Sequence, residues 1–128
     1  MITQDSLSLL LTKIRNGFKY RNHYIIHQNT KINKDVVQLL YLHGFLRGYR
    51  LLNNNLYIYP KFNDVNPVLR SIKRVSRPGF KKYITVAALK ELQISQPNFI
   101  VVSTVNGIMS HDSAIQQNLG GEFLFIVS

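Results

Sequence analysis

The sequence contains no cysteine, and only six acidic residues stand among its 128. Without cysteine it forms neither a disulfide framework nor a thiolate metal site, and this composition fits a reducing compartment. No run of about 18 apolar residues occurs, so we expect no membrane-spanning helix. An amphipathic pattern begins by Leu7, and we therefore expect neither a signal peptide nor a typical transit peptide.

Catalytic and metal-binding motifs are lacking as well. The few acids offer no paired carboxylates for general acid–base catalysis, and no G-x-S-x-G elbow or phosphate-binding glycine loop is present. His23 and His27 fall on an expected loop and strand, so they would not face one metal ion together. His111 and Asp112 are adjacent, which predicts side chains that point apart. We expect no enzyme, no cofactor and no metal site, although sequence spacing leaves a triad assembled in space open.

Positive charge dominates what is present. Sixteen lysines and arginines give a net charge of +10, and all of them lie at or before Lys90. Residues 91–128 carry only the acids Glu91, Asp112 and Glu122. A folded domain with this imbalance repels itself, which predicts a polyanionic partner for the first ninety residues. If the last part of the chain contacts RNA, it does so through backbone groups, hydroxyls and shape.

The hydrophobic pattern predicts an α+β fold with a domain junction near Asp64–Pro67, which divides the chain into domains over residues 1–64 and 65–128. The pattern of the first domain predicts the element order helix, strand, helix, strand, strand. The first expected helix runs from Asp5 or Ser6 to about Asn16 and is stopped by Gly17, and a strand Tyr24–His27 follows. The second expected helix is capped by Asn33, ends at Gly44 and has Leu42 facing inward. A hairpin of Phe45–Leu52 and Leu56–Tyr59 around three asparagines completes the domain.

The second domain is expected to be mostly antiparallel β with short helices. Arg77-Pro78-Gly79 forces a turn after an extended segment, and the nearly all-apolar strand Phe99–Thr104 is expected to be buried on both faces. The other expected elements are the extended segment Val68–Val75, a helix capped by Thr85, a helix capped by Ser110 that ends near Leu119, and an edge strand Glu122–Val127.

Hydroxyls and one carboxylate mark the candidate binding residues of the second domain. Ser103 and Thr104 either satisfy backbone groups in the turn that follows their strand or, with Asn106, contact sugar hydroxyls and base edges of RNA. Glu122 is either an outward residue that deters edge-to-edge pairing or a carboxylate that accepts from the glycine-turn amides or orients the two hydroxyls.

The densest basic cluster is interleaved with aromatic residues. A solvated charged face is the usual interpretation of such a cluster, but the rigid Pro-Gly turn and the net charge favour contact with phosphates, and Tyr83 is a candidate stacking group. Its basic members are Arg70, Lys73, Arg74, Arg77, Lys81 and Lys82, and its aromatic members are Phe80 and Tyr83.

Several segments together resemble the bacterial-type family of ribosomal small-subunit protein eight, an RNA-binding family. The likeness covers nearly the whole chain and includes Gly44-Phe45. Its strongest blocks are Arg74–Gly79 and Ser103–Gly107, the latter followed by Gly120-Gly121-Glu122. Weaker blocks are Leu11–Gly17 and Thr30-Lys31-Ile32.

The resemblance implies two small α/β domains packed together. It also implies binding to the central domain of small-subunit ribosomal RNA during assembly, mainly by the second domain, with neighbouring small-subunit proteins as further partners. It implies a primary contact through Ser103, Thr104, Asn106 and Glu122, with Tyr83 and Lys31 nearby and Thr12 and Arg15 facing RNA from the first domain. Together with the motif glycines and the basic cluster, the expected RNA-binding residues are Ser103, Thr104, Asn106, Gly107, Gly120, Gly121, Glu122, Tyr83, Lys31, Thr12, Arg15, Arg74, Ser76, Arg77 and Lys81.

Two positions depart from the family pattern Ser-Thr-Ser-Lys-Gly. Val105 replaces the second serine, which removes one hydrogen bond worth about 0.5–1.5 kcal/mol, and Asn106 replaces the lysine, which removes one charge. Both changes indicate a diverged RNA site. The chain is also rich in asparagine, isoleucine, lysine and tyrosine, residues that AT-rich codons encode.

We therefore expect a non-catalytic structural protein of the ribosome, organelle-encoded and mitochondrial, with a plastid or the bacterial cytoplasm as alternatives. We expect no membrane and no small-molecule substrate among its partners. The rival interpretation is a basic interaction module for an acidic protein or an anionic surface, which would ignore nucleic-acid structure.

Overall fold

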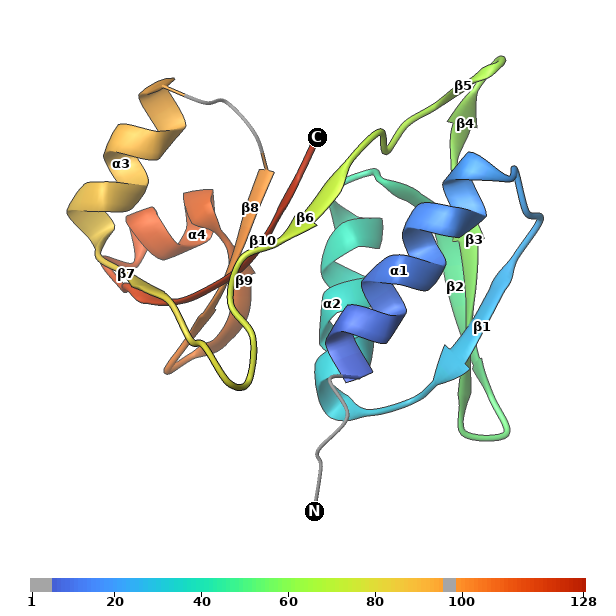
Figure 1. Ribbon diagram of the computed structural model, residues 1–128, viewed down its shortest axis with the longest axis horizontal. Helices are drawn as coiled ribbons and strands as arrows, with labels where there is room; N and C mark the ends of the chain where they lie inside the picture. The colour runs from blue at the N-terminus through green and yellow to red at the C-terminus, as the bar shows by residue number, and fades with distance from the viewer. Residues whose placement is uncertain (1–5, 96–98) are drawn as a thin grey trace. The chain divides into compact units, whose positions relative to one another are not determined.

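The computed structural model describes residues 6–95 and 99–128 and confirms the α+β class (Figure 1). Asp5, considered as a helix cap, lies outside the described residues. In chain order the elements are α1 (Ser6–Lys19), β1 (Ile25–Gln28), α2 (Lys31–Leu42), β2 (Leu46–Leu52), β3 (Asn55–Pro60), β4 (Phe62–Asn63), β5 (Asn66–Pro67), β6 (Ile72–Arg74), β7 (Tyr83–Ile84), α3 (Val86–Ser95), β8 (Phe99–Thr104), β9 (Gly107–Ser110), α4 (His111–Gln116) and β10 (Gly121–Val127).

The chain divides into two compact units, Met1–Arg70 and Ser71–Ser128. The first contains a three-stranded antiparallel sheet in the order β1-β3-β2 and the small β4-β5 hairpin. The second contains a sheet in the order β6-β10-β8-β9, with β7 also paired to β10. The functional division at residues 64 and 65, with RNA binding assigned mainly to the second part, stays a prediction.

In the first unit, α1 and α2 pack on one face of the sheet (Figure 1). The predicted apolar stripe of α1 is buried, as is every second residue of β3, Leu56 and Ile58 among them. The β2-β3 turn is confirmed, since Asn53 and Asn54 adopt φ of 51° and 62°, the left-handed pair that a tight hairpin requires.

The predicted end of the first helix is wrong. Gly17 lies inside α1 and is buried, because the side chain of Ile25 packs where a Cβ of residue 17 would stand. The helix instead ends at Lys19, followed by Arg21 at φ 55°. Gly17 therefore serves the close approach of β1 to α1.

Two details of the second helix also differ from prediction. Thr30 is the cap, with its hydroxyl accepting from the amide of Asn33 at 3.3 Å. Asn33 is fully buried, and its side-chain Nδ2 donates to the Ser6 hydroxyl at 2.9 Å. This hydrogen bond connects α2 to α1. Leu42 was expected to face inward but is 68% exposed, as the last residue of α2.

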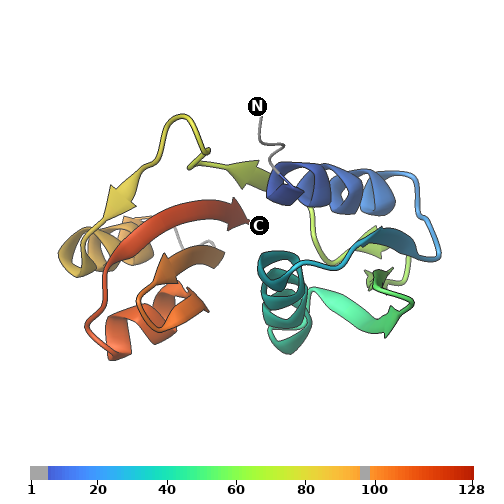
Figure 2. The same cartoon turned by 90° about the horizontal axis from the view of Figure 1, so that it is seen from below.

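In the second unit, β10 is a central strand and not the predicted edge strand. It pairs with β8 on one side and with β6 and β7 on the other. The strand β9, which was not predicted, forms the edge beside β8. Helices α3 and α4 lie together beside the sheet and cover a core around Leu89, Ile100 and Val102 (Figure 1, Figure 2). The predicted caps Thr85 and Ser110 are confirmed.

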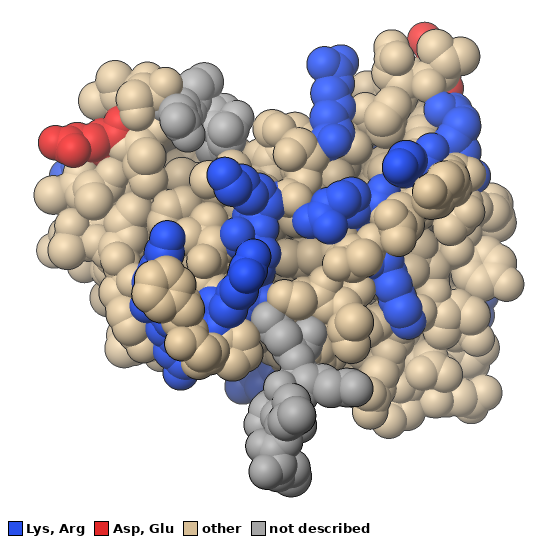
Figure 3. Space-filling view, viewed as in Figure 1, with Lys and Arg blue, Asp and Glu red and all other residues tan. Residues whose placement is uncertain are grey.

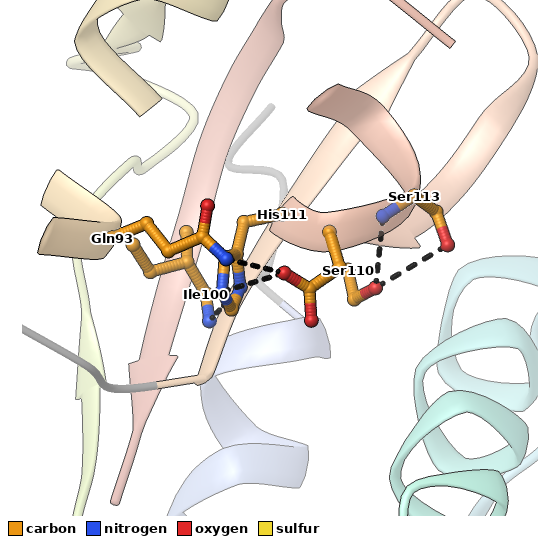
Figure 4. Close-up of polar contacts among 6 residues, drawn as sticks. Gln93, Ile100, Ser110, His111 and Ser113 are labelled. Atoms are coloured by element: carbon orange, nitrogen blue, oxygen red, sulfur yellow. Dashed lines mark hydrogen bonds and ion pairs between the residues drawn. The ribbon is translucent and has the colours of Figure 1, made fainter. Parts of the chain in front are cut away.

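His111 and Asp112 do not point apart as predicted. His111 Nε2 lies 3.5 Å from Asp112 Oδ1, and Gln93 Nε2 donates to the same oxygen at 2.8 Å. On its other side, His111 Nδ1 accepts from the amide of Ile100 at 3.1 Å (Figure 4). The neighbouring Ser110 hydroxyl is engaged with Ser113 at the start of α4. These contacts join α3, α4 and β8.

None of the helices within residues 6–95 and 99–128 is long and apolar enough to cross a membrane. Over the same residues, no group of three or more histidines and acids lies close enough together to hold a metal ion.

His27 makes the first unit sensitive to acid. Its side chain is buried on β1, and this burial together with the positive charge of Lys13 lowers the pKa of His27 below its usual value. As the pH falls below about 6.5, the unfolded chain binds a proton at His27 more readily than the folded chain does. The free energy of unfolding should therefore decrease as the pH falls from about 6.5 through the lowered pKa of His27 in the folded protein.

Urea unfolding of the wild type and of His27→Gln between pH 8 and pH 5 measures this effect. We expect the variant to lose part of the pH dependence that the wild type shows. Equal pH slopes for His27→Gln and the wild type would contradict the assignment.

Candidate RNA interface

Three predicted site residues lie in one row across the second sheet. Glu122 of β10 is the direct cross-strand partner of Ser103 on β8 and of Tyr83 on β7. Cross-strand partners place their side chains on the same face of a sheet, about 5 Å apart. Ser103 and Glu122 are half-buried, whereas Tyr83 is 72% exposed. The row therefore joins a hydroxyl, a carboxylate and an open aromatic ring on a rigid support.

Two glycines allow the strands at this row to approach closely. A Cβ added at Gly121 would overlap the carbonyl oxygen of Ser103, and one added at Gly120 would stand 2.6 Å from the carbonyl oxygen of Ile84. Both obstacles are backbone atoms, which cannot move aside as a flexible side chain can. Gly120 and Gly121 therefore allow β10 to pair closely with its neighbours, and their contact with RNA stays a prediction.

Ser76 holds the carboxylate of Glu122. The Ser76 side chain is fully buried, and its hydroxyl donates to Glu122 Oε2 at 2.5 Å while accepting from the amide of Lys82 at 3.2 Å. Glu122 therefore neither points away from an edge nor accepts from the glycine turn in this conformation. It is oriented by the loop that follows β6, beside Ser103.

The turn between β8 and β9 uses the hydroxyl of Thr104 internally. Thr104 Oγ1 donates to the carbonyl of Gly107 at 3.0 Å and accepts from the amide of Asn106 at 3.1 Å. The turn-stabilising interpretation therefore describes Thr104. Asn106 is exposed and donates to Gln117 at 3.3 Å, and Val105 is 90% exposed at the tip of the turn.

Four basic members of the cluster and Phe80 line a cavity of about 460 Å³. Arg74 and Arg77, both predicted site residues, lie in its wall, and the Lys82 ammonium stands 5.4 Å from the centre of the Phe80 ring. Lys81 is exposed but does not line the cavity. The remaining lining residues are Lys73, Val75, Phe123 and Ile126. Figure 3 shows how strongly lysine and arginine outnumber acidic side chains on one face of the molecule.

The remaining predicted residues belong to the first unit. Thr12 and Arg15 are exposed on α1, and Lys31 is exposed at the start of α2. The structure thus brings Ser103, Glu122 and Tyr83 together in the second unit. Thr12, Arg15 and Lys31 belong to the first unit.

Sequence reasoning missed a cluster of aromatic side chains in the first unit. Tyr57 and Tyr59 alternate with the buried Leu56 and Ile58 along β3. This alternation was the available signal, because it places both rings on the face opposite the buried residues.

Comparisons with known proteins cover almost the whole chain. The model of the family described as Ribosomal protein S8 matches residues 5–127. Small ribosomal subunit protein uS8 of Chlamydia caviae is 33% identical over 131 residues, which cover 98% of each chain. The proteins of the same name from Afipia carboxidovorans and Nitrobacter winogradskyi are each 36% identical over 132 residues, with 99% of each chain covered. The similarity therefore extends over both compact units.

Proposed function

Because the chain belongs to the ribosomal protein S8 family, we propose that it is a structural constituent of the small ribosomal subunit that binds the central domain of the subunit's RNA and supports assembly. The row of Tyr83, Glu122 and Ser103 is the observation that carries this proposal. Its neighbours in the subunit would be other small-subunit proteins.

The two kinds of site residue divide the work of binding. Arg74, Arg77 and Lys81 contact phosphates, and this electrostatic attraction supplies most of the affinity. It does not distinguish one RNA sequence from another, because every nucleotide carries the same backbone charge. Ser103 and Glu122 contact sugar hydroxyls and base amino groups in the shallow minor groove, and the exposed ring of Tyr83 offers a stacking surface. Lys31, Thr12 and Arg15 add contacts from the first unit.

The rigid support of the row favours recognition of one RNA shape. Gly121 and the Ser76–Glu122 hydrogen bond hold the carboxylate beside Ser103 before any RNA arrives. Preorganised donors and acceptors lose little entropy on binding. The exposed Val105 presents no hydrogen-bonding group, so the RNA opposite it is expected to differ from that of relatives with serine there.

The ribosomal protein S8 family is structural and non-enzymatic, and the compared relatives are bacterial. For this chain we propose a mitochondrial ribosome, because the sequence is rich in asparagine, isoleucine, lysine and tyrosine, residues that AT-rich codons encode. A plastid or bacterial ribosome is the alternative location.

Binding of the purified chain to small-subunit RNA fragments, with duplex RNA and heparin as competitors, tests the proposal. We expect tight binding to one central-domain fragment that survives heparin and collapses in the Ser103→Ala/Glu122→Ala double variant. If six to ten phosphates are contacted, affinity should fall by about 10³- to 10⁵-fold between 50 and 200 mM salt, on the scale of duplex DNA.

The matched control is Ser95→Ala/Glu91→Ala, which removes an exposed serine and an exposed glutamate of α3. It should leave fragment binding intact. Equal displacement of the wild type by every polyanion would instead describe a basic module for acidic proteins or anionic surfaces, and the proposed function would fail.

A further inference from the structure

Four rings cluster on one face of the sheet in the first unit. Tyr24 contacts Tyr57 and Tyr59, with ring centres 5.9 and 6.4 Å apart. His23 lies 6.2 Å from Tyr24 and 6.3 Å from Tyr59, in both cases edge to face. Tyr24 is 47% exposed and its neighbour Ile26 is 41% exposed. The cluster is therefore open to solvent and not part of the core.

This aromatic face lies opposite the helices. Leu56 and Ile58 of β3 are fully buried beneath α1 and α2, so the alternate residues Tyr57 and Tyr59 point to the other side of the sheet. The aromatic face is thus distinct from the helical surface of the same unit, which carries the residues expected to contact RNA there.

Two arginines flank the rings. The Arg47 guanidinium lies 5.3 Å from the centre of the Tyr59 ring, and Arg21 lies 4.4 Å from that of Phe62. Arg21 is also held by the carbonyl oxygens of Val65 at 2.7 Å and Asp64 at 3.5 Å. The Arg21 guanidinium is therefore positioned in advance, and both guanidinium groups offer further N–H donors.

Two of the cavities that Arg47 lines adjoin the aromatic face. The larger of these two, of about 340 Å³, is lined by Arg21, Asn22, His23, Arg47, Pro60 and Phe62. The other, of about 250 Å³, is lined by Arg47, Gly48 and Tyr59. Gly48 is the cross-strand partner of Tyr59, and a Cβ added there would meet nothing within 4 Å. The absence of a side chain at Gly48 therefore leaves open space beside the Tyr59 ring.

We propose that this surface binds an unpaired segment of RNA, in which a base stacks on the Tyr59 ring beside Gly48 and the adjacent phosphates contact Arg21 and Arg47. Unpaired bases stack on aromatic rings and guanidinium planes, and the positive charge that accompanies them attracts the backbone. Asp35 and Asp64 are the only acids of the described part of the first unit, so the surface is strongly complementary to a polyanion. An acidic protein segment would pair with the arginines but would leave the ring faces unused.

The inference goes beyond the proposed function, because it adds a second RNA contact that is independent of the row in the second unit. It also concerns single-stranded RNA, whereas the row is proposed to contact the minor groove of an RNA helix. A probe without secondary structure therefore separates the two.

Fluorescence anisotropy of a labelled octauridylate with the full chain tests the inference. Tyr59→Ala should weaken binding by about 5- to 100-fold, the range expected for loss of one stacked base. Gly48→Glu should weaken it at least as much, since it fills the open space and introduces a negative charge. Gly48→Ala, which adds only a methyl group, should have a much smaller effect.

Tyr49→Ala is the matched control. Tyr49 is also a tyrosine of this sheet but packs against Tyr41 of α2, with ring centres 5.6 Å apart, on the helical side. It should leave octauridylate binding unchanged, and thermal unfolding verifies that every variant is folded. Photocrosslinking of a 5-iodouridine-substituted probe should label the peptide that contains Tyr57 and Tyr59.

Unchanged octauridylate binding in folded Tyr59→Ala and Gly48→Glu would overturn the inference, as would crosslinking confined to the second unit. If the same two variants lost binding of an acidic peptide but kept binding of octauridylate, the inference would also be overturned and the surface would be assigned to a protein. Failure of the central-domain fragment to bind would contradict the proposed function only.

Discussion

Gly121→Ala is expected to destabilise the second unit by about 3 kcal/mol or more. The added methyl group would overlap the carbonyl oxygen of Ser103 and approach Thr104 Cα to 3.2 Å. Because these are backbone atoms of the paired strand, β8 and β10 would have to separate where Glu122 meets Ser103. Thermal unfolding should show the lower stability, and binding to the central-domain RNA fragment should weaken with it.

Other glycines of the same unit supply graded controls. Gly120→Ala places the methyl group 2.6 Å from the Ile84 carbonyl oxygen and should be the next most harmful. Gly79→Ala places it in open space and should leave the melting temperature unchanged or slightly raised, because alanine restricts the unfolded chain. If Gly121→Ala and Gly79→Ala melted at the same temperature, the close approach of the two strands would not be a determinant of stability.

Local features of this fold could be predicted from the sequence. The caps Thr85 and Ser110 each accept from an amide three residues later, so their signal lies within one turn. The Asn53-Asn54 turn is likewise specified by residues that tolerate positive φ. Patterns of this kind need no information from distant parts of the chain.

The errors arise where distant residues decide the outcome. Gly17 resembles a helix end, but its role depends on Ile25 of the next strand. Asn33 resembles a cap, but its side-chain Nδ2 donates to the Ser6 hydroxyl and to the carbonyl oxygen of Gln28. The strand β10 comes last in the sequence, which suggests an edge, yet it lies between strands from residues 72–84 and 99–104.

The candidate site shows the same division. The residue types were evident in the motifs around Ser103 and Glu122, and the structure places those two opposite each other. The contribution of Ser76 as the partner of the carboxylate was not evident, because the two residues are 46 positions apart. Hydrogen bonds of this range depend on tertiary structure, which no local pattern encodes.

Ser76→Ala is expected to cost about 1.5–3 kcal/mol of the free energy of unfolding, the range for hydrogen bonds to charged groups. The substitution deprives Glu122 of its donor and leaves the amide of Lys82 without the hydroxyl that accepts from it. Ser76 is fully buried, so water does not readily replace the missing group. Urea unfolding measures the loss, and Ser95→Ala, at an exposed serine of the same unit, serves as the control with little expected change.

A double-mutant cycle with Glu122→Gln separates the Ser76–Glu122 bond from the rest of the Ser76 environment. If the charged hydrogen bond dominates, the double variant should be less destabilised than the sum of the single variants, with a coupling of about 1 kcal/mol or more. RNA affinity should follow the same pattern, because a carboxylate released from Ser76 no longer has a defined position beside Ser103. Additive effects on stability together with unchanged RNA affinity in Ser76→Ala would contradict the orienting role of this bond. The carboxylate would then depend on β10 alone for its position.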